Sequence, residues 1–446
     1  MTWVTLGVLA LTTFLLVWHH ARYLSRTPWW LLWLVLMLPG LVVGVWVWFH
    51  GEQQAMPAIL VVMPFLLSGV FYFLLVRQGG GVPRLLTETT AAPLTPAEVT
   101  HLRQCFPWEL YALQRIDQRE GVVVCAGRLR GNAATAYRVV AQNIHAQLGQ
   151  RFWLILAPNP DQKPYFALVP RRRPAPRPDG WVIGVTSLGL GLWITRTVTA
   201  PYLGIAQPLG WGYGVGVLAI LLAREVGQRW GLHPHGVKSG WPWLIPFPLW
   251  PGVLGTYSGM MEPLPDRRAL VDRTWLGVAL GLVVTLCLLL WGLGHSQLTP
   301  GGFLPHHSYL LWVVSRWVWG DALTAGMGLH LHPVAWAGVV GLGLLGIQLT
   351  PVGRLDGGCL LHALVGRRGA QRWGWVTKAL VLLLGWQVQP WLRGWGVLLL
   401  FIPTMPPLVL NEVTELDPQR DGLGLLGLGL FLAIILPAPG FLPRVG

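Results

Sequence analysis

Charged residues are scarce in this sequence, and acidic residues are the scarcest of them. Charged side chains make up 11% of the 446 residues, with 18 acidic against 32 Lys and Arg residues, whereas 53% are hydrophobic. An ordinary soluble domain carries about 25% charged residues. Such a low fraction excludes a chain whose whole surface is solvated by water, and it favours a protein that lies mostly in a lipid bilayer.

Cysteine is rare as well, with four residues in the chain. Cys105, Cys125, Cys287 and Cys359 are far apart and have neither disulfide nor metal-site spacing. This excludes a disulfide-rich secreted domain and a zinc-finger-like module. We interpret the four residues as small members of packed cores.

Long apolar runs, by contrast, are abundant. A transmembrane helix needs about 20 largely apolar residues, and about ten runs approach this length, some of them short or interrupted by Gly and Pro. The sequence therefore predicts an α-helical polytopic membrane protein. The runs are residues 3–17, 29–49, 57–76, 181–195, 209–223, 275–293, 334–349, 376–388, 397–409 and 423–436.

The arginines in short loops predict the orientation, because Lys and Arg are enriched in cytoplasmic loops. With the first run crossing from outside to inside, every strongly basic loop falls on the cytoplasmic side. The net charge of +14 then reflects this orientation and contact with anionic membrane lipid, and nucleic acid is not an expected partner. The residues are Arg22, Arg26, Arg77, Arg84, Arg171, Arg172, Arg173, Arg177, Arg267, Arg268, Arg273, Arg367, Arg368 and Arg372.

The polar interval after the third run predicts a small α+β domain on the cytoplasmic side, at residues 82–178. It would separate an N-terminal region of three spans, residues 1–77, from a membrane domain at residues 181–440. Within it, Thr95 and Glu98 form a capping box that predicts the start of a helix. Helical periodicity predicts a second helix at 133–148, and β-rich runs predict a strand at 121–127 and a hairpin at 151–157 and 165–169.

Four stretches, in this order, resemble the site-2 proteases, which are intramembrane zinc metalloproteases, and specifically their EGY-type chloroplast and cyanobacterial branch. Residues 120–170 resemble the N-terminal domain of that branch. Residues 223–272, beginning AREVGQRWG and including LGTYS and LPDRR, are similar to its H-E-x-G-H helix and the strand that follows. The segment LTPVGRLDGG at 349–358 resembles its Asp-Gly-Gly motif, and LNEVTE at 410–415 a motif near its C-terminus.

The resemblance implies a zinc site whose ligands this chain has largely lost. The family needs two His one helical turn apart, a Glu as general base and a distant Asp. These fall on Arg224, Gln228, Glu225 and Asp356 respectively. Arginine is permanently protonated and glutamine offers only a neutral carbonyl oxygen, so we expect no zinc and no other cofactor. We expect Arg224 to form an ion pair with Asp356 instead.

The resemblance also implies a substrate groove in which a peptide would add to a strand. Two positions depart from the family pattern: Gln348 replaces an Asn, and Ser258 replaces the Gly that closes the strand. Both departures weaken the expectation of peptide binding. The implied groove positions are Gly255, Thr256, Tyr257, Gln348 and Pro351.

The leading functional hypothesis is a catalytically inactive site-2 protease homologue, a membrane scaffold or modulator that binds transmembrane protein partners. The alternative is an active intramembrane endopeptidase with an unconventional metal site, rebuilt from other histidines. A channel or transporter has less support, because charges within the apolar runs are nearly absent. The resemblance implies a cyanobacterial thylakoid or plasma membrane. The histidines considered are His233, His235, His306, His307, His330, His332 and His362.

Overall fold

The computed structural model describes nine continuous stretches of the chain and isolated positions between residues 7 and 75. The stretches are 28–51, 94–119, 122–158, 163–171, 180–206, 209–246, 252–260, 262–324 and 327–439. The chain divides into two compact units, residues 1–94 and 95–446. The runs predicted as spans at 3–17 and 57–76 lie outside the continuous described stretches.

The first unit contains one fully described helix, α2 (Trp29–His50), which confirms the helix predicted at 29–49. Pro28 precedes it and Gly51, with φ 78°, ends it. The helix is apolar on all sides, and large side chains such as Trp48 are exposed. A helix of this length with an apolar surface all round is typical of one that faces lipid.

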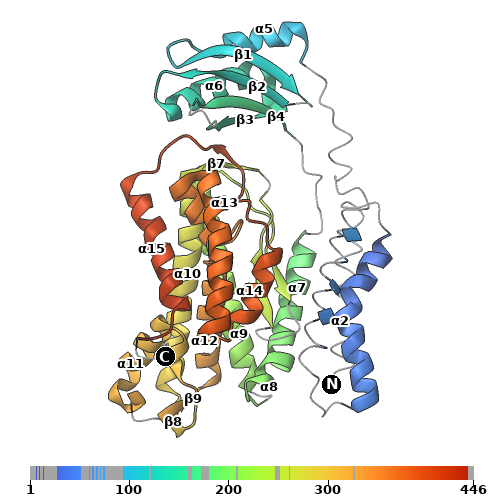
Figure 1. Ribbon diagram of the computed structural model, residues 1–446, viewed down its shortest axis with the longest axis vertical. Helices are drawn as coiled ribbons and strands as arrows, with labels where there is room; N and C mark the ends of the chain where they lie inside the picture. Colours follow the sequence, from blue (N-terminus) through green and yellow to red (C-terminus); the bar gives the residue numbers. More distant parts are fainter. Residues whose placement is uncertain are drawn as a thin grey trace. The chain divides into compact units, whose positions relative to one another are not determined.

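The second unit begins with an α+β layer of two helices and four antiparallel strands (Figure 1). The predicted helix at 133–148 is confirmed in full, because Asn132 caps its first turn and Gly149 ends it with a positive φ. The predicted hairpin and capping box are also present. The elements are α5 (Pro96–Gln104), β1 (Tyr111–Arg119), β2 (Val122–Leu129), α6 (Ala133–Leu148), β3 (Phe152–Ala157) and β4 (Tyr165–Pro170).

An aromatic core fills this layer. The rings of Tyr111 and Phe166 meet edge-on, 4.9 Å apart, and the Tyr111 hydroxyl donates a hydrogen bond to the Cys125 carbonyl oxygen at 2.9 Å. Burial raises the pKa of the Cys125 thiol to about 12, so this cysteine stays protonated. Cys125 is therefore an inert core residue, as the sequence predicted, whereas the same prediction is wrong for Cys287, which is exposed.

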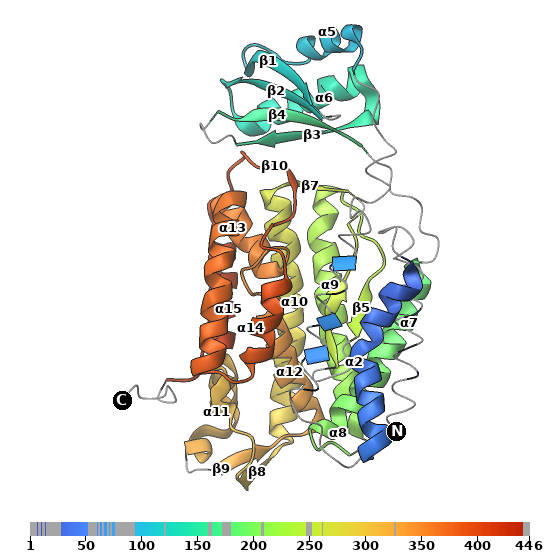
Figure 2. The same ribbon diagram turned by 45° about the vertical axis from the view of Figure 1, so that its right-hand side comes forward.

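Two further strands extend the sheet from distant parts of the chain. The strand order is β1-β2-β4-β3-β10-β7, with β7 (Leu264–Asp266) and β10 (Val409–Asn411). The short strand β10 pairs in parallel with β3 on one side and with β7 on the other. Because β7 leads directly into α10 (Arg267–Gly294), the sheet joins the α+β layer to the helices (Figure 2).

The remaining helices form the apolar body of the second unit. Among the described residues, three helices of the chain are long and apolar enough to cross a membrane: α2, α10 and α15 (Pro418–Ile435). Shorter apolar helical stretches lie at Gly184–Ile194, Pro333–Gln348 and Leu392–Phe401. The other helices are α7 (Gly180–Ile194), α8 (Ala200–Tyr202), α9 (Gly210–Leu232), α11 (Tyr309–Trp319), α12 (Pro333–Gln348), α13 (Asp356–Gln387) and α14 (Leu392–Phe401).

The span predicted at 397–409 is wrong in its second half. Helix α14 ends at Phe401, the next seven residues are not helical, and Val409 begins β10. Pro403, Pro406 and Pro407 explain the end, because proline lacks the N–H that continues a helix. The run predicted at 376–388 is the second part of α13, which breaks at Gly366 where φ is 75°.

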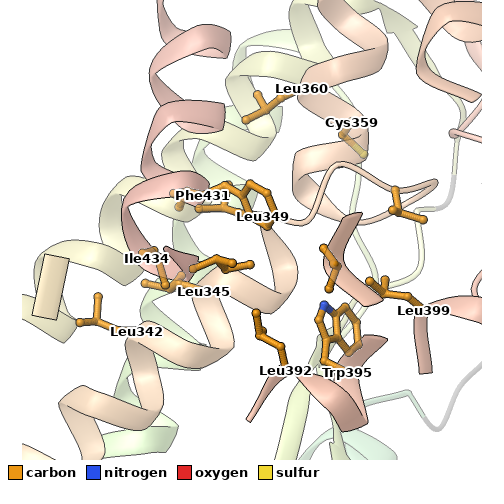
Figure 3. Packing of buried hydrophobic residues seen from close by; sticks show 14 of the residues in the cluster. Leu342, Leu345, Leu349, Cys359, Leu360, Leu392, Trp395, Leu399, Phe431 and Ile434 are labelled. Carbon is orange, nitrogen blue, oxygen red and sulfur yellow. The ribbon is translucent and has the colours of Figure 1, made fainter. Parts of the chain in front are cut away.

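Helices α9 and α10, in the middle of the apolar body, pack closely against each other at glycine residues. A Cβ atom on Gly227 would lie 2.2 Å from the Leu276 carbonyl oxygen, and one on Gly231 would lie 2.3 Å from that of Asp272. Small residues at such spacing let two helix backbones pack closely. In the core, Leu345 of α12 and Leu349, the residue that follows this helix, pack with Phe431 and Ile434 of α15 (Figure 3).

Candidate functional site

Helix α9 and the start of α13 together place the three implied metal-ligand positions. Arg224 and Gln228 lie one helical turn apart on α9, so both side chains point from the same face. Asp356 is the first residue of α13. Arg224, Gln228 and Asp356 are 6%, 3% and 5% exposed, so the three polar groups meet in the interior.

Arg224 and Asp356 form the ion pair that the sequence predicted. The Arg224 Nη2 and Nε atoms donate to Asp356 Oδ2 at 2.6 and 3.1 Å. Gln228 Nε2 donates to the other carboxylate oxygen at 3.4 Å. Both oxygens of Asp356 therefore accept hydrogen bonds from the two residues that replace the family's histidines.

The hydrogen-bond network continues onto two more elements. Arg224 Nη1 donates to Thr256 Oγ1 at 3.1 Å, which ties α9 to β6 (Val253–Tyr257). Arg273 of α10 donates from Nη2 to Gln228 Oε1, also at 3.1 Å. The sequence did not predict Arg273 as a member of this site. Helix α10 runs close to α9 here, since a Cβ atom on Gly277 would lie 2.5 Å from Gln228 Cγ, and no local sequence pattern indicates this approach.

Glu225, the implied general base, is not hydrogen-bonded to the described residues of the network. Its side chain is buried, and neither carboxylate oxygen accepts a hydrogen bond from a described residue. The contact that balances its charge is with Arg229 one turn later, whose Nε lies 3.5 Å from Glu225 Oε1. Glu225 is thus held beside a cation and is not bonded to Asp356.

The groove positions are only partly brought together. Strand β6 pairs with β5 (Trp243–Pro246), and a Cβ atom on Gly255 would lie 2.6 Å from Gln348 Nε2, so Gln348 packs directly on the strand. Tyr257 is 51% exposed, and Pro351 lines a separate apolar cleft between α13 and α15. Gln348 therefore contacts β6 at Gly255, and Thr256 and Tyr257 follow on the same strand.

These residues do not fit a zinc ion. Asp356 is the one anionic ligand among the three positions, and its Oδ2 already accepts two hydrogen bonds from the Arg224 guanidinium. A guanidinium has no lone pair to donate to a metal. A cation fixed beside Asp356 would also repel a divalent ion. No three His, Cys, Asp or Glu side chains gather closely enough to hold a metal anywhere in the described stretches.

The other histidines have different surroundings. His233 is exposed, whereas its neighbour His235 lies with Nε2 2.8 Å from Asp272 Oδ2. His362 is fully buried with Nε2 3.8 Å from Glu412 Oε1. His332 accepts a hydrogen bond at Nδ1 from the Val334 N–H, as the N-cap of α12.

Comparison with known proteins gives one consistent group of relatives. The chain is 29% identical to "Probable zinc metalloprotease EGY2, chloroplastic" of Arabidopsis thaliana over 366 residues, covering 75% of this chain and 64% of the relative. It is 25% identical to EGY2 of Oryza sativa subsp. indica over 387 residues, covering 80% and 69%. The chain is thus similar to EGY-type zinc metalloproteases, as its resemblance to that branch of the site-2 proteases implied.

Other EGY-type proteins match over a shorter region. Arabidopsis EGY1 is 29% identical over 250 residues, which is 54% of this chain and 44% of that relative. The chain thus spans less than two thirds of the length of the Arabidopsis proteins EGY2 and EGY1. No family model matches this EGY-type chain. No solved structure matches it.

Proposed function

We propose that this EGY-type protein does not cleave peptides and acts as a membrane scaffold or modulator that binds transmembrane protein partners. The observation that carries the proposal is the Arg224–Asp356 ion pair, in which a guanidinium lies against the one remaining ligand position. In the family's chemistry a metal activates the attacking water. Here the corresponding side chains are bonded to one another, and they tie α9, β6 and α13 together.

The position of Glu225 supports the same proposal. A general base must reach the proton that it removes, and its basicity depends on the charges beside it. Glu225 is buried with Oε1 3.5 Å from Arg229 Nε, and it has no hydrogen-bonded contact with the ion pair.

Binding without cleavage would use the surface around β6 and the α+β layer. Gly255 and Gln348 lie together as in the implied groove, and the mixed sheet links the α+β layer to the same helices. We propose about ten spans, with residues 1–77 and 181–440 in the membrane and residues 82–178 on the cytoplasmic side. The relatives are named chloroplastic, and a thylakoid or plasma membrane of a cyanobacterium is the proposed location.

Elemental analysis of the purified protein tests the loss of the metal site. We expect well under one zinc per chain, and we expect a labelled membrane-peptide substrate to stay intact with or without a chelator. A stoichiometric zinc that disappears in Asp356→Ala, or cleavage that the chelator stops, would instead support the endopeptidase alternative. An Arabidopsis EGY2 preparation, purified identically, controls for metal lost during purification.

Protease accessibility in oriented vesicles tests the proposed topology. We expect protease to cut residues 82–178 in inverted vesicles and to spare them in sealed right-side-out vesicles. The reverse pattern would contradict the orientation but leave the family assignment unchanged.

A further inference from the structure

An apolar cleft of about 630 Å³ lies between α13 and α15, and its lining includes neither Arg224 nor Asp356. The two helices lie side by side (Figure 2). Most of the lining is aliphatic or aromatic, with Thr377 and Gln387 as the polar exceptions. Its exposed members are large: Trp373, Leu380, Leu383, Leu432 and Leu436 are each 41% to 59% exposed.

Helix packing explains why the cleft opens on this part of α15. Gly424 and Gly427 bring the first half of α15 against α13, since Cβ atoms there would lie 3.0 Å from Leu364 and 2.4 Å from Leu360. Leucines replace the glycines in the following turns, at Leu428 and Leu432. Larger side chains hold helices further apart, and the second half of α13 meets α15 across the cleft.

We propose that this cleft binds an acyl chain of an anionic membrane lipid, with the lipid's headgroup beside Arg372. Helix α15 is apolar and long enough to cross a bilayer, so its exposed leucines face hydrocarbon. A transmembrane helix is about 10 Å across, which is much wider than an extended hydrocarbon chain. A single extended hydrocarbon chain is slender enough to occupy it.

The positive charge of Arg372, at one end of the cleft, favours a lipid with an anionic headgroup. Arg372 is exposed and precedes the cleft residue Trp373, and it lies about three turns before Leu383 on nearly the same face of α13. Arg367 and Arg368 lie just before it, and the second part of α13, residues 367–387, contains no acidic residue. Basic residues at the cytoplasmic end of a helix attract anionic lipids, and a tryptophan beside them suits the headgroup layer.

Native mass spectrometry of the full chain, released from nanodiscs of equal parts phosphatidylglycerol and phosphatidylcholine, tests the proposal. We expect one phosphatidylglycerol to be retained in preference to phosphatidylcholine. Arg372→Gln should weaken this preference about fivefold, the effect of removing one basic residue near a membrane surface. Leu380→Trp, which fills the cleft from an exposed position, should reduce retention of both lipids.

Lys238→Gln is the matched control, since Lys238 is also an exposed cation but lies far along the chain from the cleft helices. Equal retention of the two lipids by the unmodified protein would overturn the proposal. So would an equal loss in Lys238→Gln and Arg372→Gln. Photocrosslinking from position 380 to a protein helix, with no lipid captured, would also overturn it.

Discussion

The guanidinium of Arg224 gives two hydrogen bonds to a single oxygen of Asp356, while Gln228 approaches the other oxygen. Both members of the pair are more than nine-tenths buried, at 7% and 6% side-chain exposure. A buried pair of this kind is costly to break from one side, because the charge left behind has neither water nor a partner.

Asp356→Ala should therefore destabilise the protein by about 3 to 5 kcal/mol, and more than the double variant Arg224→Ala/Asp356→Ala. Denaturant unfolding in detergent measures the coupling through a double-mutant cycle. The exposed pair Arg115–Asp117 provides the control, since surface pairs contribute about 1 kcal/mol or less. Coupling near zero at the buried pair would mean that water reaches it.

Arg224→His combined with Gln228→His should create a zinc site. The two substitutions give the sequence His-Glu-Val-Gly-His, with both imidazoles one turn apart on α9 and facing Asp356. We expect about one zinc per chain by elemental analysis, because two neutral ligands replace a cation and an amide. Adding Asp356→Asn should remove most of the metal, and zinc that stays would have to be bound elsewhere.

Gly227→Ala should force α9 and α10 apart. The added Cβ would lie 2.2 Å from a backbone oxygen of Leu276, which cannot move without moving the helix, and overpacking costs about 1 to 3 kcal/mol. Gly343→Ala in α12 is the control, because nothing lies within 4 Å of its Cβ position and alanine favours a helix by about 1 kcal/mol. Thermal unfolding should shift in opposite directions for the two variants.

The stability of the protein should depend on pH through Glu412. Burial raises the pKa of this carboxyl group above its ordinary value of 4.5, against the opposing effect of Arg367, Arg267 and Arg368. The folded state then binds the proton more tightly than the unfolded state. The contribution of Glu412 to stability is therefore greatest below pH 4.5, and it is lost as the pH rises through the pKa of Glu412 in the folded protein.

A comparison of Glu412→Gln with the unmodified protein isolates this effect, because the amide cannot titrate. The difference in unfolding midpoint between the two should grow in favour of Glu412→Gln as the pH rises from 4.5. The carboxyl group of Glu98 should instead add stability as the pH rises, because hydrogen bonds from the Thr95 N–H and from Arg151 lower its pKa. If the unfolding midpoints of Glu412→Gln and the unmodified protein changed with pH in parallel, the raised pKa of Glu412 would be contradicted.

Local signals predicted much of the α+β layer and little of what joins it to the helices. The bounds of α6 follow from Asn132 and Gly149, which act within a few residues of the helix ends. Strand β1 was not predicted, because its sequence YALQRIDQR is mostly polar and its pairing partner decides its conformation. Strands β7 and β10 have three residues each, too few for any periodicity to register.

The residues of the candidate site were likewise predicted only in part. The family resemblance located Arg224, Gln228 and Asp356, and charge complementarity predicted which of them would pair. Arg273 could not be assigned, because its contact with Gln228 depends on how closely α9 and α10 approach. The motif implied a groove position for Pro351, which stays a prediction, and the structure shows that this residue also lines the cleft between α13 and α15.

The position of β10 sets an order of events during synthesis. Its partner β3 leaves the ribosome early, whereas Val409–Asn411 emerges after nearly all of the helices that must enter the membrane. Until then one edge of β3 has no strand beside it, and an open edge can pair with other chains. The nascent α+β layer therefore keeps this edge of β3 open until Val409–Asn411 has been made.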